Sequence, residues 1–129
     1  GAREFLVWLR QQGIRTGIAS SNGIELVETV LKAQGIQEYL ESVHTCCEVP
    51  KGKPAPDIYL LVAETLGVKP EECLVFEDVP MGILAGKNAG MRVCAVEDTF
   101  SASQREEKKE LADYYIESYD EIPRERMQP

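Results

Sequence analysis

Three short polar clusters in the sequence carry functional groups that could bind and transfer a phosphoryl group. The first offers two hydroxyls and an amide at the start of a predicted helix, where backbone N–H groups favour a phosphate. The second offers a lysine between a glycine and a proline, and the third offers two adjacent carboxylates, which suit a hard cation such as Mg²⁺. Hydroxyl donors, a cation and a magnesium-binding acid together meet the charge demands of phosphoryl transfer. The residues concerned are Ser20, Ser21 and Asn22, then Lys53, then Glu77 and Asp78.

Each cluster also has a plainer interpretation when it is taken alone. Ser-Asn-Gly sequences are common in turns and helix caps, and a Lys-Pro-x-Pro sequence can be a loop with an exposed charge. Two acids after a strand can simply complement the dipole of the helix that follows. The order and context of all three clusters favour the phosphoryl-transfer interpretation over these separate ones.

The elements that must position these clusters are short strands alternating with helices. Strands are predicted over residues 14–20, 42–47, 73–76, 92–96 and 113–116. Helices are predicted over residues 2–12, 24–31, 57–66, 80–88 and 101–111. This alternation predicts an α/β domain with a doubly wound parallel sheet over residues 1–122, followed by a loose tail over 123–129. Ligands of such sheets bind at the carboxyl ends of the strands, where the three clusters should meet.

Length and charge exclude several other classes of protein. The 129 residues suit one domain, and the net charge of −8 opposes binding to nucleic acid or to an acidic membrane. No apolar run approaches the ~20 residues of a membrane helix, and the N-terminus lacks a secretory pattern. We therefore expect a cytoplasmic protein with no membrane or nucleic-acid partner.

The cysteines and the single histidine do not form a recognisable metal or nucleophile motif. The four cysteines show no C-x-x-C spacing, so we expect buried free thiols rather than a zinc site or disulfides. His44, the one histidine, is expected to pack against its apolar segment rather than to serve a nucleophile. The charged run over 106–110 is expected to be a solvated helix face.

At this point the sequence resembles the haloacid dehalogenase superfamily, in the branch that includes β-phosphoglucomutase and phosphoglycolate phosphatase. The matching segments are residues 17–22, 51–59, 73–83 and 89–91. The resemblance implies a Rossmann-like core and a Mg²⁺ cofactor.

The resemblance also implies a role for each residue of the three clusters. Ser20 matches the hydroxyl that hydrogen-bonds the transferring phosphoryl group, and Asn22 lies where a neighbouring group helps to position it. Lys53 matches the lysine that neutralises charge on the phosphoryl group and the nucleophile. Asp78 matches the direct Mg²⁺ ligand, and Glu77 is a second acid at or just behind the metal.

One motif of the family is absent from the chain. The family's nucleophile is the first aspartate of an Asp-x-Asp motif on an N-terminal strand, and no Asp-x-Asp occurs in these 129 residues. The resemblance thus implies the C-terminal part of a core that is incomplete at its central strand and is partnered by a missing N-terminal segment. The family fold places that strand between the strands ending at Ser20 and Glu77. Since neighbouring strands lie ~4.8 Å apart, these two should be ~10 Å apart.

The function expected from the resemblance is that of a Mg²⁺-dependent phosphoester hydrolase or phosphomutase. Its substrate would be a small phosphorylated metabolite, such as a sugar phosphate, and its intermediate a phosphoaspartate. The chain alone should be inactive because the nucleophile lies elsewhere. The alternative is a non-catalytic half-core that binds phosphate or another polypeptide. A metal-free dehalogenase is disfavoured by the Glu77–Asp78 pair.

Overall fold

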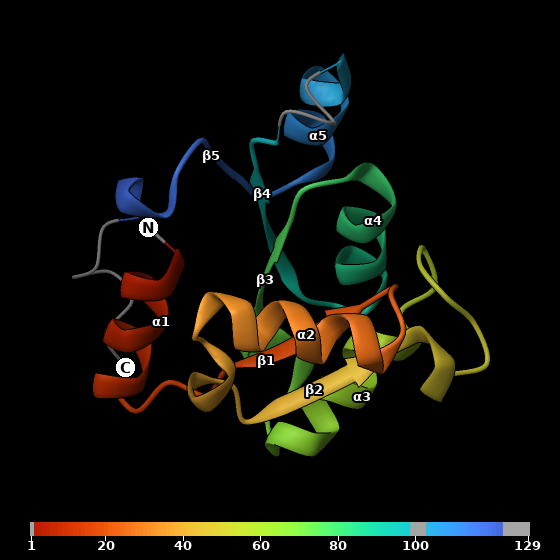
Figure 1. Ribbon diagram of the computed structural model, residues 1–129. Helices are drawn as coiled ribbons and strands as arrows, with labels where there is room; N and C mark the ends of the chain where they lie inside the picture. The colour runs from red at the N-terminus through yellow and green to blue at the C-terminus, as the bar shows by residue number, and fades with distance from the viewer. Residues whose placement is uncertain (1, 99–102, 123–129) are drawn as a thin grey trace.

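Helices and strands alternate along the chain in the computed structural model, which describes residues 2–98 and 103–122 (Figure 1). The helices are α1 (Ala2–Gln11), α2 (Ile24–Gln34), α3 (Asp57–Leu66), α4 (Pro80–Asn88) and α5 (Arg105–Leu111). The strands are β1 (Gly17–Ser20), β2 (Ser42–Thr45), β3 (Leu74–Glu77), β4 (Arg92–Val96) and β5 (Tyr114–Ile116). Short 3₁₀ turns are η1 (Gln37–Tyr39), η2 (Cys46–Glu48), η3 (Pro70–Glu72) and η5 (Tyr119–Glu121). The predicted α/β class is confirmed.

Several element boundaries differ from the prediction because pairing with a neighbour sets where a strand begins and ends. β1 begins at Gly17, which pairs with the first residue of β2, rather than at residue 14. β3 extends to Glu77, which pairs with Ala95, rather than ending at residue 76. The predicted residues 46–47 of β2 instead turn into η2. The first residues of the predicted 101–111 helix lie partly outside the described residues, and α5 begins at Arg105.

The described strands form two parallel sheets rather than one. β1 pairs with β2 in the first sheet, and the second has the order β3-β4-β5. Figure 1 shows the β1–β2 pair below the longer β3–β4 pair. Within the described residues β1 and β3 are therefore not neighbours. This agrees with the expectation that the strands ending at Ser20 and Glu77 do not pair with each other. Each of the two also has one edge without a strand partner among the described residues.

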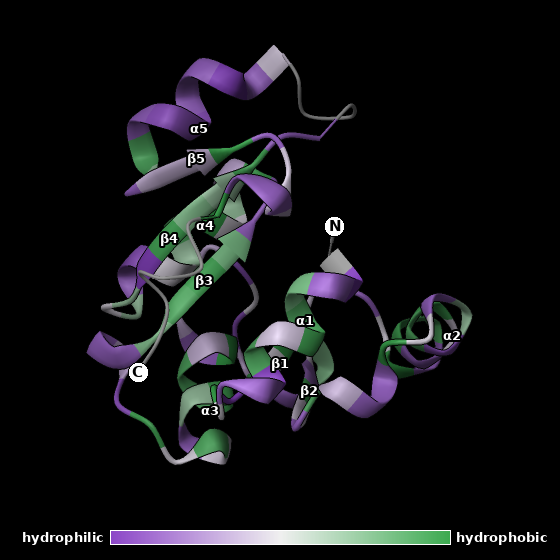
Figure 2. Cartoon of the chain, turned by 90° about the vertical axis from the view of Figure 1, so that its left-hand side faces the viewer, coloured by the Kyte–Doolittle hydropathy of each residue, from purple (hydrophilic) through white to green (hydrophobic). Residues whose placement is uncertain are grey.

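The main hydrophobic core lies between α3, α4 and the sheet that contains β3 and β4. Figure 2 shows these strands as largely hydrophobic segments beside the two helices. Helix α3 also packs on β1 and β2, so one helix contacts both sheets. The buried residues of this core include Ile58, Tyr59 and Ala63 of α3, Val75 of β3, Ile83 and Ala85 of α4, and Val93 and Ala95 of β4.

Helix α1 packs on the sheet that contains β3 through aromatic rings. The Phe5 ring of α1 lies 5.5 Å from the Phe76 ring of β3 in an edge-on arrangement and 5.7 Å from the Tyr119 ring, centroid to centroid. Such pairs contribute about 0.5–1.5 kcal/mol beyond their buried area. Helix α1 is thereby attached to β3 although it precedes β1 in the chain.

The charged run over 106–110 is not wholly solvated, so that expectation is wrong at one position. Lys108 has no exposed surface, and its ammonium donates to the Val96 carbonyl at 2.7 Å. A lysine stem is long enough to bury its methylene groups while its charge reaches a polar atom, which a run of charged letters does not reveal. The neighbouring residues Glu106, Glu107, Lys109 and Glu110 are exposed.

The cysteines are free thiols, but burial is complete at Cys94 alone among them. Burial raises the pKa of Cys94 to about 11, so this thiol stays protonated. Cys46 and Cys73 are half-buried and Cys47 is exposed, which corrects the expectation of four buried thiols. No helix among the described residues has the length and apolar character that crossing a membrane requires. The predicted tail over 123–129 lies outside the described residues.

Candidate active site

The first polar cluster forms a turn between β1 and α2. Ser20 is the last residue of β1, and its hydroxyl oxygen accepts the Asn22 backbone N–H at 3.0 Å. Ser21 and Asn22 are exposed, and the Cys46 thiol contacts the Ser21 carbonyl at 2.9 Å. The turn places a hydroxyl and an amide at the first turn of a helix, where backbone N–H groups favour an anion. A shallow groove of about 220 Å³, bordered by Ser20, Asn22 and apolar residues of α2, adjoins it.

Lys53 connects the ends of the two sheets. Its ammonium donates to the Ala19 carbonyl of β1 at 3.1 Å and forms an ion pair with the carboxylate of Glu77 at the end of β3. The Lys53 side chain is only 12% exposed. The loop that carries it is anchored by the Asn88 amide, which donates to the Pro54 carbonyl at 3.0 Å. The plainer interpretation of Lys53 as an exposed loop charge therefore does not hold, because the side chain is fixed between β1 and β3.

Glu77 points into the protein, although it is charged. It is 9% exposed, and its Oε2 accepts hydrogen bonds from the Lys53 ammonium and from the Tyr59 hydroxyl of α3. Gly82 makes room for it, because a Cβ added there would lie 2.2 Å from the Glu77 carboxyl carbon. A buried carboxylate needs such donors, since an unpaired buried charge costs several kcal/mol.

Sequence reasoning missed Tyr59, whose apolar helical spacing indicated only a core position. The Tyr59 side chain is 7% exposed. Burial, reinforced by the Glu77 charge, raises the pKa of Tyr59 well above its usual range, so its hydroxyl keeps its proton and remains a donor. The sequence signals were its hydroxyl within a helix otherwise suited to the core and its place at the end of the matching segment 51–59.

The two acids predicted as a pair face different surroundings. Glu77 is the last residue of β3 and is buried, whereas Asp78 follows in the turn and is exposed. Consecutive residues at a strand end point to opposite sides, which separates the two carboxylates.

The carboxylates of Glu77 and Asp78 have the hard oxygen ligands that Mg²⁺ prefers. Within residues 2–98 and 103–122, however, no three Asp, Glu, His or Cys side chains gather as a metal site. Asp78 is thus the exposed candidate ligand, and Glu77 is committed to Lys53 and Tyr59. These residues fit Mg²⁺ as one part of its ligand set.

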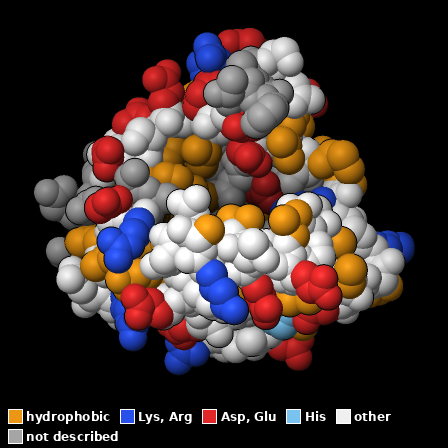
Figure 3. Space-filling model, in the orientation of Figure 1, with side chains coloured by type: hydrophobic (Ala, Val, Ile, Leu, Met, Phe, Trp, Pro, Cys, Tyr) orange, Lys and Arg blue, Asp and Glu red, His pale blue; other side chains and the backbone are white. Residues whose placement is uncertain are grey.

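One face of the molecule is hollowed. Figure 3 shows a depression near the centre of this view, with acidic and hydrophobic side chains along its wall. The structure thus brings Ser20, Asn22, Lys53 and Glu77 to the carboxyl ends of β1 and β3, with Asp78 one residue beyond. Their catalytic, phosphate-binding and metal-binding roles remain predictions.

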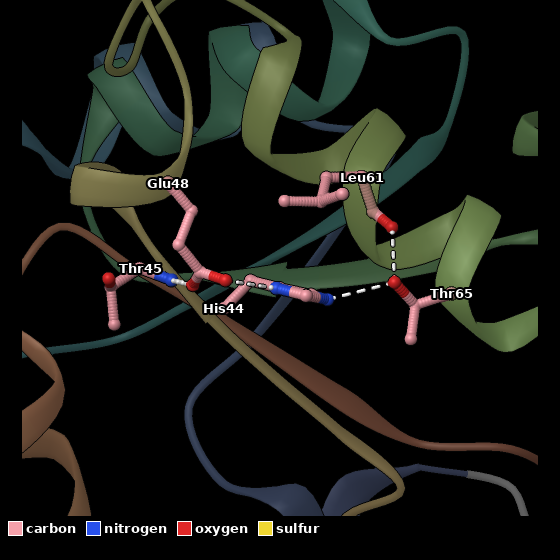
Figure 4. Close-up of polar contacts among 5 residues, drawn as sticks. All are labelled: His44, Thr45, Glu48, Leu61 and Thr65. Carbon is pink, nitrogen blue, oxygen red and sulfur yellow. Dashed lines mark hydrogen bonds and ion pairs between the residues drawn. The ribbon is translucent and has the colours of Figure 1, made fainter.

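A second polar group involves the single histidine (Figure 4). His44 Nδ1 lies 2.9 Å from Glu48 Oε1, and Nε2 lies 2.8 Å from the Thr65 hydroxyl. The hydrogen bond with His44 lowers the pKa of Glu48. His44 is therefore held by polar contacts, which corrects the expectation of apolar packing.

The arrangement places a hydroxyl, an imidazole and a carboxylate in one row. The Thr65 hydroxyl also lies 3.0 Å from the Leu61 carbonyl of its own helix, to which it can donate. The group joins β2 to α3 through the His44–Thr65 contact.

Comparisons with known proteins identify the family. A family model for haloacid dehalogenase-like hydrolases matches residues 1–90. Hexitol phosphatase A of Escherichia coli is 41% identical over 96 residues, which are 74% of this chain and 44% of that protein. A variant of CbbY from Rhodobacter sphaeroides, solved with xylulose-(1,5)-bisphosphate, is 28% identical with a TM-score of 0.84, over 93% of this chain and 53% of that one. β-Phosphoglucomutase from Clostridium difficile is 25% identical with a TM-score of 0.81, over 99% and 53%. The chain spans about half the length of the curated relatives it matches.

Proposed function

The chain belongs to the haloacid dehalogenase-like hydrolase family, and we propose that its residues serve the active site of a Mg²⁺-dependent phosphoester hydrolase or phosphomutase. The observation that carries the proposal is the position of Lys53 between the Ala19 carbonyl and the Glu77 carboxylate. This position puts one cation at the junction of the serine turn and the acidic strand end. The substrate binds where these groups converge.

The roles of the side chains follow from their donors and acceptors. A lysine ammonium has three N–H donors, and the contacts with Ala19 and Glu77 use two, so the third is directed to an anion. The Ser20 hydroxyl and the turn at Asn22 bind phosphoryl oxygens beside it. Asp78, with Glu77 behind it, holds the Mg²⁺ ion. When bound, this ion offsets the negative charge that phosphoryl transfer concentrates.

The nucleophile is an aspartate on a strand that this sequence does not contain. The free edges of β1 and β3 support this part of the proposal, because a strand between them would pair with both and bring its end beside Ser20 and Asp78. Residues 1–129 alone then bind phosphate but do not turn over a substrate.

The substrate class is a small phosphorylated metabolite. Relatives named for hexitol phosphates and for validoxylamine A 7'-phosphate, and a similar structure with xylulose-(1,5)-bisphosphate, support a sugar phosphate or a close analogue. A hydrolase transfers the phosphoryl group to water, and a mutase returns it to the sugar. The two activities differ in which acceptor reaches the intermediate.

The proposal is tested with Lys53→Met and a matched control, Lys87→Met. Lys87 also pairs with a carboxylate, that of Asp113 at 2.7 Å, but on the exposed side of α4. The assay uses the native polypeptide, meaning one that includes the nucleophile-bearing strand, with Mg²⁺ and p-nitrophenyl phosphate. There, Lys53→Met should lower kcat by at least roughly a hundredfold. Lys87→Met should leave it unchanged.

Binding of inorganic phosphate, measured by calorimetry, gives a second readout that does not require turnover. Lys53→Met should weaken it, and Lys87→Met should not. Equal behaviour of the two variants would contradict the role of Lys53. Phosphate binding without any turnover by the native polypeptide would favour the alternative of a non-catalytic half-core.

A further inference from the structure

We infer that Tyr59 is a positioning residue of this site, whose hydroxyl holds the Glu77 carboxylate in the orientation that fixes Lys53; the inference rests on the proposed function. Tyr59 lies in the first turn of α3, and its side chain is buried in the core. Tyr59 belongs to none of the three polar clusters of the sequence.

Tyr59 contacts both members of the ion pair, through different parts of its ring. Its hydroxyl donates to Glu77 Oε2, the same oxygen that receives the Lys53 ammonium. Its ring face lies 5.0 Å from Lys53 Nζ, within the range of a cation–π interaction. The ammonium is thus placed by the Ala19 carbonyl, the Glu77 carboxylate and the Tyr59 ring.

The hydroxyl matters because Glu77 would otherwise depend on one donor. With Lys53 as its sole partner, the buried carboxylate would draw the ammonium toward itself and away from an incoming phosphoryl group. A second donor on Oε2 shares that negative charge. Gly82 has no Cβ, and the carboxylate occupies the space that a side chain there would need.

The chain contains a second tyrosine with the same set of contacts, although it is only half-buried, and it serves as a control. The Tyr115 hydroxyl donates to Glu97 Oε2, which also accepts from Arg105 at 2.7 Å, and Lys109 lies 5.0 Å from the centroid of the Tyr115 ring. Tyr115 lies on β5, Glu97 follows β4, and the two cations lie on α5. Removal of either hydroxyl therefore deletes the same type of contact, but only Tyr59 borders the site.

The experiment compares Tyr59→Phe with Tyr115→Phe in the native polypeptide, with Mg²⁺ and p-nitrophenyl phosphate. Loss of a group that orients a site residue typically costs roughly tenfold to hundredfold in activity. We expect Tyr59→Phe to lower kcat by that factor and to leave KM within about twofold, because the substrate itself is not contacted. Tyr115→Phe should change neither. Adding Tyr59→Phe to Lys53→Met should cause no further loss, since the two residues act as one unit.

A double-mutant cycle of Tyr59→Phe and Glu77→Gln in urea unfolding tests the contact without requiring activity. Coupling between the two substitutions is expected, and their simple additivity would show that the contact does not exist. A kcat for Tyr59→Phe equal to that of Tyr115→Phe, or an additive loss on top of Lys53→Met, would overturn the positioning role. Absence of turnover in an unmodified polypeptide that includes the nucleophile-bearing strand would refute the proposed function, and coupling in urea would then leave Tyr59 a purely structural contact.

Discussion

Gly82→Ala should destabilise the protein by displacing a side chain rather than the backbone. The added Cβ would lie 2.2 Å from the Glu77 carboxyl carbon and 2.3 Å from its Oε1, distances that real contacts do not reach. The atoms met are the end of a flexible side chain, so Glu77 must move and lose its donors, Lys53 and Tyr59. Replacing glycine by alanine in a helix stabilises it by about 1 kcal/mol, whereas loss of each hydrogen bond to a charged group destabilises the protein by about 1.5–3 kcal/mol. The free energy of unfolding should therefore fall by about 3 kcal/mol.

Gly86→Ala, in the same helix, is the control for this substitution. Its Cβ would lie 2.6 Å from a Val93 methyl, so it overpacks the core without touching Glu77. Urea unfolding of both variants, each with and without Tyr59→Phe, separates the two causes. In the Gly82→Ala background, Tyr59→Phe should not lower the free energy of unfolding any further. In the Gly86→Ala background, it should lower that free energy as much as it does in the unmodified protein. Stability of Gly82→Ala within about 0.5 kcal/mol of the unmodified protein would refute the reasoning.

Two further predictions concern positions away from the site. Ser42 is 5% exposed, and its Oγ has no hydrogen-bond partner among the described residues, so Ser42→Ala should raise the free energy of unfolding in urea by about 1 kcal/mol. A loss of stability would reveal a hidden partner. The hydrogen bond with His44 lowers the folded-state pKa of Glu48 below its usual 4.5, and the hydrogen bond with Lys87 lowers that of Asp113 below its usual 3.8. Each acid therefore stabilises the fold at a pH above its usual value, and this stabilisation is lost as the pH falls through the folded-state pKa. Glu48→Gln and Asp113→Asn should each flatten the decline of stability in acid, and an unchanged pH profile would contradict the shifts.

The positions of the strand ends could be predicted because apolar segments stop abruptly at polar residues. Ser20 and the Glu77–Asp78 pair were located in this way, and the parallel topology then predicted that they share one edge. The separation of β1 from β3 required the family resemblance, since strand order is not encoded in the periodicity of any one strand.

Local patterns could not reveal contacts that depend on tertiary packing. The prediction ended β3 one residue early, and this single residue decides that Glu77 is buried while Asp78 is exposed. Tyr59 meets Glu77 across 18 residues of sequence, through the packing of α3 on β3. The burial of Lys108 likewise depends on the distance to the Val96 carbonyl of β4 rather than on its charged neighbours.

The position of Lys53 makes its chemistry inseparable from the fold. The same ammonium that is proposed to meet a phosphoryl group also connects the Ala19 carbonyl of one sheet to the Glu77 carboxylate of the other. Removing one member of a buried ion pair typically costs about 3–5 kcal/mol, so Lys53→Met must weaken the fold as well as the site. Helix α3, which contacts β1 and β2 and also contributes to the core around β3 and β4, remains as a link between the sheets and should keep the variant folded. A loss of phosphate binding at temperatures where the variant is still folded would therefore report on the charge of Lys53 itself.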